Sequence, residues 1–294
     1  MTEQESLARE FEEYRPQLRA VAYRMLGSLS EADDAVQDAW LRVGRADATE
    51  VENLRAWLTT IVARVSLNML RARRTRREGP LDVHLPDPII DPEDGTDPEH
   101  EALLADSVGL ALLVVLETLT PAERLSFVLH DMFAVPFEDI APIVERSPEA
   151  TRQLASRARR RVRGADPLPD ADLAAQWEVV EAFLAAARGG DFDALVAVLD
   201  PDVEVRADGG VAGITQHIRG AATVARQALM FSSIGLTMRR ALVNGAAGMV
   251  SFRDGRPFSL CALTIKNGRI AKMNFLTDPE RLAALDLAVL EADA

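Results

Sequence analysis

The sequence contains one cysteine, two lysines among its 33 basic residues, and no long apolar run. The lone cysteine, Cys261, excludes an internal disulfide. The apolar runs are far shorter than the roughly 20 residues that a helix needs to cross a bilayer, and the N-terminal residues carry acids where a secretory signal has basic and then apolar residues. We therefore expect a cytoplasmic protein that makes no contact with a membrane.

Positive charge is also absent from one whole segment, residues 79–106, which holds nine acidic residues and no lysine or arginine. The same segment holds five prolines, and this composition predicts an extended, mobile linker. The chain as a whole has a net charge of -13. With 294 residues, 48% of them hydrophobic, it is long enough for two or three globular domains.

Three helices are expected before the linker, because apolar residues recur at helical spacing over residues 10–26, 32–43 and 54–77. Ser30 followed by Asp33 resembles a capping box that starts the second helix. The outer face of that helix presents Asp33, Asp34, Gln37 and Asp38. The third helix ends in five arginines, a pattern that fits a charged helix tail as well as a nucleic-acid contact.

Sequence patterns that start helices recur after the linker. The stretch Thr120-Pro121-Ala122-Glu123 has the cap, the first-turn proline and the glutamate that begin a helix. A short helix follows from Pro136, and Pro142 should bend it because proline removes an internal hydrogen bond. Ser147-Pro148-Glu149 then caps and starts another helix.

This last helix concentrates six arginines within residues 151–163 of an acidic protein. Its outer face presents Arg152, Gln153, Ser156, Arg159, Arg160 and Arg163. A short helix, a tight turn and a helix with long polar donors outward form a helix-turn-helix, which reads DNA in the major groove. The alternative is a solvated charged face, which the scarcity of acids on this helix disfavours.

Beyond residue 169 the pattern changes from purely helical to mixed. Helices are expected over 171–188, 192–199 and 221–231, and strands over 203–205, 236–244, 247–253, 257–266 and 269–276. Helices followed by a meander of strands predict an α+β domain.

Long stretches of the first half resemble a known family. "YRPQLRAVAYRMLGSLSEADDAVQDAWLR", "LRAWLTTIVARVSLNMLR" and "LTPAERLSFVLHDMFAVPFEDIAPIVERSPEATRQLASRARRRV" are similar, in order over residues 10–163, to domains 2 and 4 of bacterial extracytoplasmic-function (ECF) sigma factors. The resemblance implies a sigma factor that directs RNA polymerase to promoters. Its expected partners are promoter DNA and core RNA polymerase, through the β′ clamp helices and the β flap.

The resemblance also implies roles for individual residues. Those expected to bind core polymerase are Asp33, Asp34, Gln37, Asp38 and Trp40. Those expected at the −10 element are Asn53, Arg55, Arg64, Asn68, Arg71 and Arg74. Those expected at the −35 element are Ser147, Arg152, Gln153, Ser156, Arg157, Arg159 and Arg160. The acidic linker is either a plain tether or, as in the family, a segment that threads through the RNA exit channel of the polymerase.

The C-terminal part narrows the resemblance to the sigma-J-like (ECF41) group, which carries a fused SnoaL-like domain of the NTF2-like cone fold. "WEVVEAFLAAARGGDFDALVAVLDPDVEVRADGG" resembles the start of that domain. Three motifs of the group are present in degraded form: His84-Leu85-Pro86 in the linker, an Asp-Gly-Gly, and a Thr-Asp-Pro-Glu-Arg-Leu near the end. The residues expected to serve regulation are Asp208, Gly209, Gly210, Asp278, Pro279, Arg281 and Leu282.

Two other functions remain open at this point. One is a stand-alone helix-turn-helix regulator that never engages polymerase. The other is a SnoaL-like enzyme fused to a DNA-binding module, for which Asp208 and His217 are the available acid and base. A single pair at this spacing is weak support, and we expect no catalytic residue, no cofactor and no metal, since the histidines are scattered and no phosphate-binding loop is present.

The predicted organisation is therefore multidomain. Two all-α sigma domains occupy residues 1–78 and 107–164, joined by the linker 79–106, and an α+β NTF2-like domain occupies 170–294. We expect the C-terminal domain to regulate the protein through intramolecular contact with the sigma domains.

Overall fold

A computed structural model describes residues 3–44, 51, 53–76, 84–93, 95, 100, 103–104, 109–165, 168–170, 172–210, 215–232, 234–287 and 290. The chain forms two compact units. Unit 1 comprises Met1–Pro80, Pro98–Asp106 and Leu112–Asp166, and unit 2 comprises Leu81–Asp97, Ser107–Ala111 and Pro167–Ala294. None of the described helices combines the length and the apolarity that a membrane span requires.

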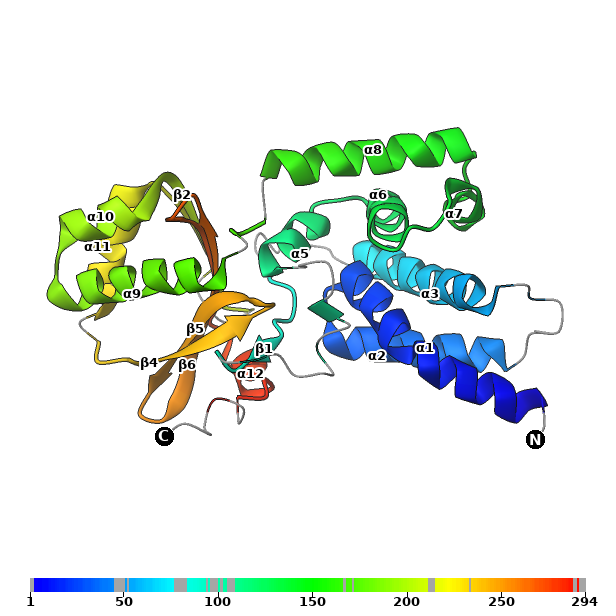
Figure 1. The fold of residues 1–294 in the computed structure, drawn as a ribbon, viewed down its shortest axis with the longest axis horizontal. Coiled ribbons are helices and arrows are strands. Elements are labelled where there is room, and N and C mark those ends of the chain that lie inside the picture. The colour runs from blue at the N-terminus through cyan, green and yellow to red at the C-terminus, as the bar shows by residue number, and fades with distance from the viewer. Residues whose placement is uncertain are drawn as a thin grey trace. The chain divides into compact units, whose positions relative to one another are not determined.

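Unit 1 begins with three packed helices, α1 (Glu3–Leu26), α2 (Leu29–Val43) and α3 (Leu54–Arg76) (Figure 1). Their buried faces meet in a core that includes Phe11, Val21, Val36, Leu58 and Val62. The cap of α2 differs from the expected one, because Ser28 rather than Ser30 accepts the Glu31 amide at 3.5 Å. The helix therefore starts at Leu29.

The second half of unit 1 is also helical, as expected. It contains most of α5 (Leu110–Glu117), and all of α6 (Pro121–Phe127), a π-helix η1 (Val128–Met132), α7 (Phe137–Val144) and α8 (Pro148–Ala165) (Figure 1). The predicted capping box is present, since the Glu123 amide bonds the Thr120 hydroxyl at 3.3 Å and the Thr120 amide bonds the Glu123 carboxylate at 3.2 Å. Pro142 lies within α7, where the helix runs for only eight residues.

Unit 2 is an α+β domain built on one curved seven-stranded sheet with the order β1-β4-β5-β6-β7-β2-β3. The strands are β1 (Ile90–Asp91), β2 (Leu199–Asp208), β3 (Gln216–Arg219), β4 (Thr237–Val243), β5 (Ala246–Arg253), β6 (Arg256–Lys266) and β7 (Arg269–Leu276). The helices are α9 (Leu173–Gly189), α10 (Phe192–Val198), α11 (Ala221–Ser232) and α12 (Pro279–Ala283). Only the β2–β7 pair is parallel among the strand pairs of the described residues.

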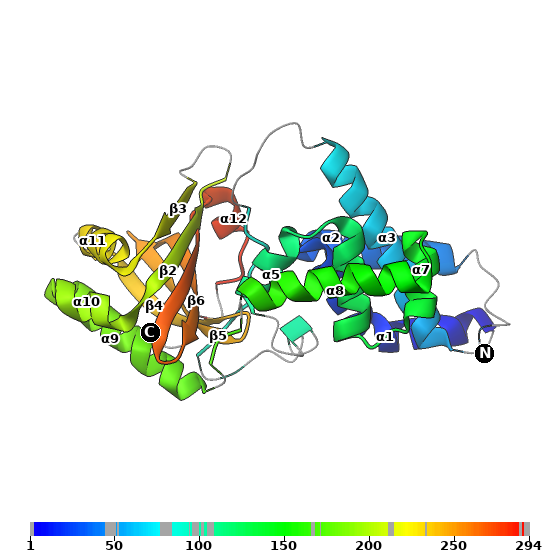
Figure 2. The same cartoon turned by 90° about the horizontal axis from the view of Figure 1, so that it is seen from above.

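Helices α9, α10 and α11 lie on one side of this sheet (Figure 2). The core between them contains Val180, Leu195, Val205, Val224 and Met273. A mostly antiparallel sheet curved over a layer of helices is the cone arrangement that the resemblance implies. The fold class expected from the sequence is confirmed.

The linker departs from its expected behaviour. Residues Ile90 and Asp91 form β1 and pair with Val243 and Leu242 of β4, so this part of the linker adds an edge strand to the sheet of unit 2. Leu85, Ile89 and Ile90 are buried there. The expectation of a mobile tether is therefore wrong for residues 84–91, because three apolar side chains in a polar segment find a hydrophobic surface.

Candidate nucleic-acid interface

The arginine-rich helix α8 starts as the sequence predicts. The Ser147 hydroxyl accepts the Ala150 amide at 3.2 Å and caps the helix. The main-chain amide of Glu149 itself, the Ser147 hydroxyl and nearby Arg152 together hold the pKa of the Glu149 carboxyl below its ordinary value. Thr151, Ala155 and Ala158 are buried and fix one face of α8 against the unit, which leaves the opposite face outward.

Two arginines of α8 are anchored to the capping glutamate of α6. The Glu123 carboxylate pairs with Arg157 Nε at 3.0 Å and with Arg161 Nη1 at 3.1 Å, and its side chain is only 5% exposed. Burial favours the protonated acid, but the bonds from Thr120 and Arg157 and the charge of Arg161 outweigh it and lower the pKa of Glu123. Sequence reasoning placed Glu123 only as a helix cap and missed that it holds α8.

The residues expected at the −35 element therefore divide into two groups. Arg157 and Arg159 make ion pairs inside unit 1, the second with Asp131 at 2.7 Å. Arg152, Gln153 and Arg160 lie exposed on the outer face, where Arg152 also covers the Phe137 ring at 5.2 Å. Ser156 is half-buried. The exposed group is the one whose donors can reach a base edge without first breaking an ion pair.

The acidic face of α2 is exposed in part. Asp33 pairs with Arg19 at 2.6 Å, and Asp38 pairs with Arg42 at 2.8 Å. Asp34 and Gln37 are exposed. Trp40 packs against Phe11 in a tilted arrangement with 4.9 Å between the ring centroids, so it supports the core as well as the surface. Leu41, 54% exposed beside this face, is a candidate contact that the charge pattern could not identify.

The residues expected at the −10 element follow one edge of α3. Asn53 accepts the Ala56 amide at 3.0 Å and so caps the helix, a role that sequence reasoning did not assign. The exposed ones on α3 are Arg55, Arg64, Asn68, Arg71 and Arg74. Arg64, Asn68 and Arg71 follow each other at spacings of four and three, so they share one face. Their donors form a polar edge suited to a nucleic-acid backbone.

Arg73, near the end of α3, makes contacts within unit 1. Arg73 donates to the Leu26 carbonyl at 3.1 Å and forms an ion pair with Glu31. It thereby joins the C-terminal part of α3 to α1 and α2. The five-arginine cluster that the sequence showed is therefore not uniform, since this member secures the helix rather than facing outward.

In unit 2, a buried aspartate holds the linker. Asp208 is 2% exposed, and its carboxylate accepts the Leu85 amide at 2.8 Å and the Arg281 guanidinium at 2.7 Å. Arg281 also donates to the Leu85 carbonyl at 2.7 Å and to Asp87 at 2.9 Å. We call Leu85, Asp87, Asp208 and Arg281 the linker clamp. Every contact in it is a hydrogen bond that involves a charged group, the stronger class of such bonds.

The degraded motifs meet at this clamp. Gly210 has a φ of 67°, and its amide bonds the Asp208 carboxylate at 3.0 Å. A methyl group at Gly210 would collide with the Asp278 side chain, so only glycine fits there. Asp278 caps α12 by accepting the amides of Glu280 and Arg281. Pro279 is the first residue of α12 and Leu282 is buried, and Gly209 is buried beside Asp208 in the chain.

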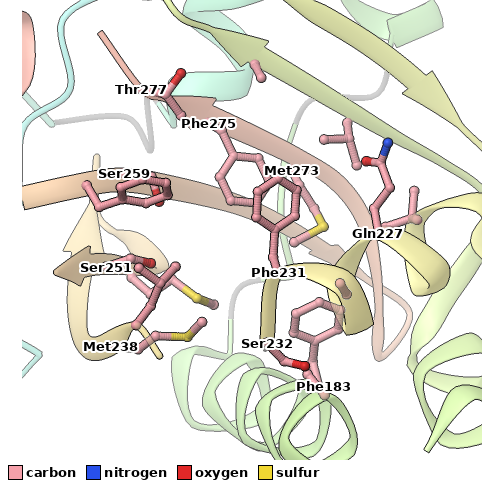
Figure 3. Close-up of a pocket in the computed structure, with 18 of the residues that line it drawn as sticks. Phe183, Gln227, Phe231, Ser232, Met238, Ser251, Ser259, Met273, Phe275 and Thr277 are labelled. Atoms are coloured by element: carbon pink, nitrogen blue, oxygen red, sulfur yellow. The ribbon is translucent and has the colours of Figure 1, made fainter. Parts of the chain in front are cut away.

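The acid and base of the enzyme alternative do not face the cavity of the cone. Val205 and Ala207 of β2, and Gln216 and Ile218 of β3, line that cavity (Figure 3 shows its interior). Side chains alternate along a strand, so Asp208 and His217 point to the other face of the sheet. His217 instead lies 3.7 Å from Glu204. Neither residue lines the cavity, so the geometry gives no support to Asp208 and His217 as an acid and base acting there.

Comparison with known proteins agrees with this geometry. The sequence patterns of sigma-70 region 2 and sigma-70 region 4 match residues 11–76 and 109–162. The ECF RNA polymerase sigma factor SigJ of Mycobacterium tuberculosis is 37% identical over 95% of this chain and 94% of its own length. The probable ECF RNA polymerase sigma factor SigI of the same species is 34% identical over 97% of this chain and 98% of its own length.

A solved structure agrees over nearly the whole chain. The crystal structure of M. tuberculosis SigJ superimposes with a TM-score of 0.75 at 35% sequence identity, and the match covers 95% of this chain and 99% of that one. The helical regions, the α+β unit and the sequence likeness thus lead to one assignment. The chain belongs to the extracytoplasmic-function sigma factors, which direct bacterial RNA polymerase to promoters.

Proposed function

We propose that this sigma factor reads its promoter through two exposed polar surfaces of unit 1 and that unit 2 restrains it by holding the linker. The observation that carries the second part is the linker clamp, in which Asp208 and Arg281 grip the main chain of Leu85 from both sides. The protein thereby has a built-in counterpart of a separate inhibitor.

The −35 element is read by the outer face of α8. Arginine donates two bonds to guanine and glutamine pairs with adenine, so Arg152, Gln153 and Arg160 are the residues assigned to base contacts. Arg157 and Arg159, already paired with Glu123 and Asp131, position the helix and contribute charge near the phosphates.

The −10 element and the polymerase are met by the first three helices. Arg55, Arg64, Asn68, Arg71 and Arg74, together with Asn53 at the helix start, are assigned to the −10 strand. Asp33, Asp34, Gln37, Asp38 and Trp40 are assigned to the polymerase, whose β′ clamp helices offer a basic partner surface in the family. The β flap is the expected partner of the region that carries α8.

Restraint by the clamp follows from competition for one segment. In the family the linker between the two sigma domains threads through the RNA exit channel of the polymerase. Residues 84–91 cannot lie in that channel while Leu85 is buried against Asp208 and β1 pairs with β4. Release of the clamp therefore precedes full engagement, and a weaker clamp raises transcription.

The test is run-off transcription with core polymerase from a cognate promoter. Arg281→Ala removes the bonds to Asp208, Leu85 and Asp87, and we expect several-fold more transcript than from the unchanged protein. Arg269→Ala removes an exposed arginine of the same unit and serves as the matched control. Equal transcript from Arg281→Ala and Arg269→Ala would refute the restraint while leaving the sigma activity itself intact.

Base reading is tested by promoter selectivity. Arg152→Ala and Gln153→Ala should each cost about 1–3 kcal/mol of discrimination at single −35 positions. Arg253→Ala, which removes an exposed arginine of unit 2, is the control for general charge. Unchanged selectivity in both α8 variants would contradict the assignment.

The remaining expectations concern the setting in which the protein works. The protein is proposed to act without catalysis, cofactor or metal, in the cytoplasm, where the polymerase is. Footprinting without polymerase separates it from a stand-alone regulator, since such a regulator protects the promoter by itself.

A further inference from the structure

The cone of unit 2 encloses a cavity of about 170 Å³ that no part of the linker clamp occupies. It lies between α9, α11 and the sheet, and apolar side chains, several of them aromatic or methionine, form most of its wall (Figure 3). Among these are Phe183, Phe231, Phe258, Met249, Met273 and Phe275. Its wall is therefore suited to an apolar body with aromatic character.

The polar groups on this wall carry no charge. They are Gln216, Gln227, Ser232, Ser251, Ser259 and Thr277, and none of the described residues that line the cavity is an acid, a base or a histidine. An ionised ligand would leave its charge without a partner in an apolar wall, which costs several kcal/mol. The cavity therefore selects a neutral ligand with one or two hydrogen-bonding groups.

The size of the cavity and its mouth limit the ligand further. A dry apolar cavity of about 150 Å³ in another protein, T4 lysozyme, binds benzene. The cavity here is of that order, and Phe231 and Met238, which line it, are 49% and 40% exposed. The interior accommodates one or two rings.

We propose that unit 2 binds a neutral, mainly apolar small molecule of one or two rings in this cavity, and that the bound molecule strengthens the linker clamp. The second part rests on the proposed function, and the first part does not. Neither part requires chemistry on the ligand, because the wall supplies no general acid or base.

A short path joins the cavity to the clamp. Thr277 lines the cavity, and its amide and hydroxyl both donate to the main-chain carbonyl of Asp208, at 2.8 Å and 3.2 Å. The carboxylate of the same Asp208 holds the Leu85 amide. Asp208 is the last residue of β2, so opening the clamp would shift the end of that strand. A ligand that packs against Thr277 and Ala207 would hold the strand end in place and so favour the closed clamp. Binding to one state alone stabilises that state by mass action.

The first experiment measures binding with prodan, a neutral naphthalene dye that carries one carbonyl acceptor and fluoresces strongly in apolar surroundings. We expect saturable binding to the full chain. Ala228→Phe fills the cavity from α11 and should weaken binding by about tenfold or more, since a packed cavity resists added volume. Ala222→Phe, on the exposed face of the same helix, is the matched control and should bind prodan as the unchanged protein does.

A thermal melt shows that each variant is folded before it is titrated. Absence of saturable binding overturns the proposal, and so does equal binding by Ala228→Phe and Ala222→Phe, because the dye would then sit on the exposed surface. A second cavity variant, Ser251→Phe from β5, should behave as Ala228→Phe does, which guards against an effect of one misfolded variant.

The second experiment measures hydrogen exchange of the Leu85 amide in the full chain. With prodan at about 100 times its dissociation constant, exchange should slow by up to about 100-fold. In Arg281→Ala the dye should still bind, with less protection of that amide. Unchanged exchange in the presence of bound dye overturns the coupling to the clamp. Transcription plays no part in either readout, so a failure of the proposed function would appear separately in the run-off assay.

Discussion

Arg124 of α6 donates from Nε to the carbonyl oxygen of Arg24 in α1 at 3.0 Å, and both residues are buried. The two positions lie 100 residues apart in the sequence. The same guanidinium pairs with Glu117 at 2.8 Å, and the Arg24 guanidinium lies 4.7 Å from the centre of the Phe133 ring. Within unit 1, these contacts join α1 to α6, the helix against which α8 packs.

Arg124→Ala should destabilise unit 1. The change leaves the Glu117 carboxylate and the Arg24 carbonyl without this donor, and losing one partner of a buried pair costs roughly 3–5 kcal/mol. Urea denaturation followed by circular dichroism measures it, since the helices of unit 1 dominate that signal. Arg163→Ala, an exposed arginine of α8, is the control, and equal midpoints for the two variants would contradict the prediction.

Acid should weaken the attachment of α8. The pKa of Glu123 in the fold lies below its ordinary value of 4.5, so its contribution to stability is complete above that value and is lost as the pH falls through the lower, folded-state pKa. We expect the difference in stability between the unchanged protein and Glu123→Gln to be full above the ordinary pKa and to shrink as the pH falls through the lower, folded-state pKa. A difference that stays constant with pH would show that the carboxylate charge does not hold α8.

Gly210→Ala should damage the clamp. The substitution forces a side chain into a left-handed backbone conformation and against Asp278, at a cost of about 1–3 kcal/mol. Differential scanning calorimetry should show a lower melting temperature for unit 2, and the Leu85 amide should exchange faster. Gly189→Ala, where the added methyl group meets open space, is the control and should leave both readouts close to those of the unchanged protein.

Cys261 should report the unfolding of unit 2. Its side chain is 1% exposed, and burial raises the pKa of the thiol, so the reactive thiolate is suppressed in the fold. A thiol reagent should label the native protein only as fast as unit 2 opens, and urea should accelerate labelling in parallel with unfolding. Rapid labelling of the native protein would mean that β6 is accessible.

Local signals made much of unit 1 predictable. The cap residue Thr120 and Pro121 predicted the start of α6, and Ser147 predicted the start of α8. Both starts could be predicted because a helix cap depends only on residues within one turn. The predicted last strand, 269–276, matches β7 in full because a tight turn precedes it and apolar residues alternate along it. The family resemblance supplied the order of the domains, which periodicity alone does not determine.

Long-range partners were not predictable in the same way. The composition around Leu85 and Ile90 is typical of a linker, and only the sheet edge at β4 turns it into a strand. Strand β3 was not expected, since its four residues are short and mostly exposed. The ion pairs of Arg157 and Arg161 with Glu123 depend on how α8 crosses α6, so the pattern of the helix could not separate anchored arginines from exposed ones.

The bond from Arg281 to the Leu85 carbonyl joins residues 196 positions apart. A chain leaves the ribosome from its N-terminus, and its domains generally fold in that order. Every residue of unit 1 is therefore synthesised before Arg281 exists. During translation the nascent sigma regions emerge with the linker unheld, and the restraint proposed above can begin only after Arg281 has been synthesised.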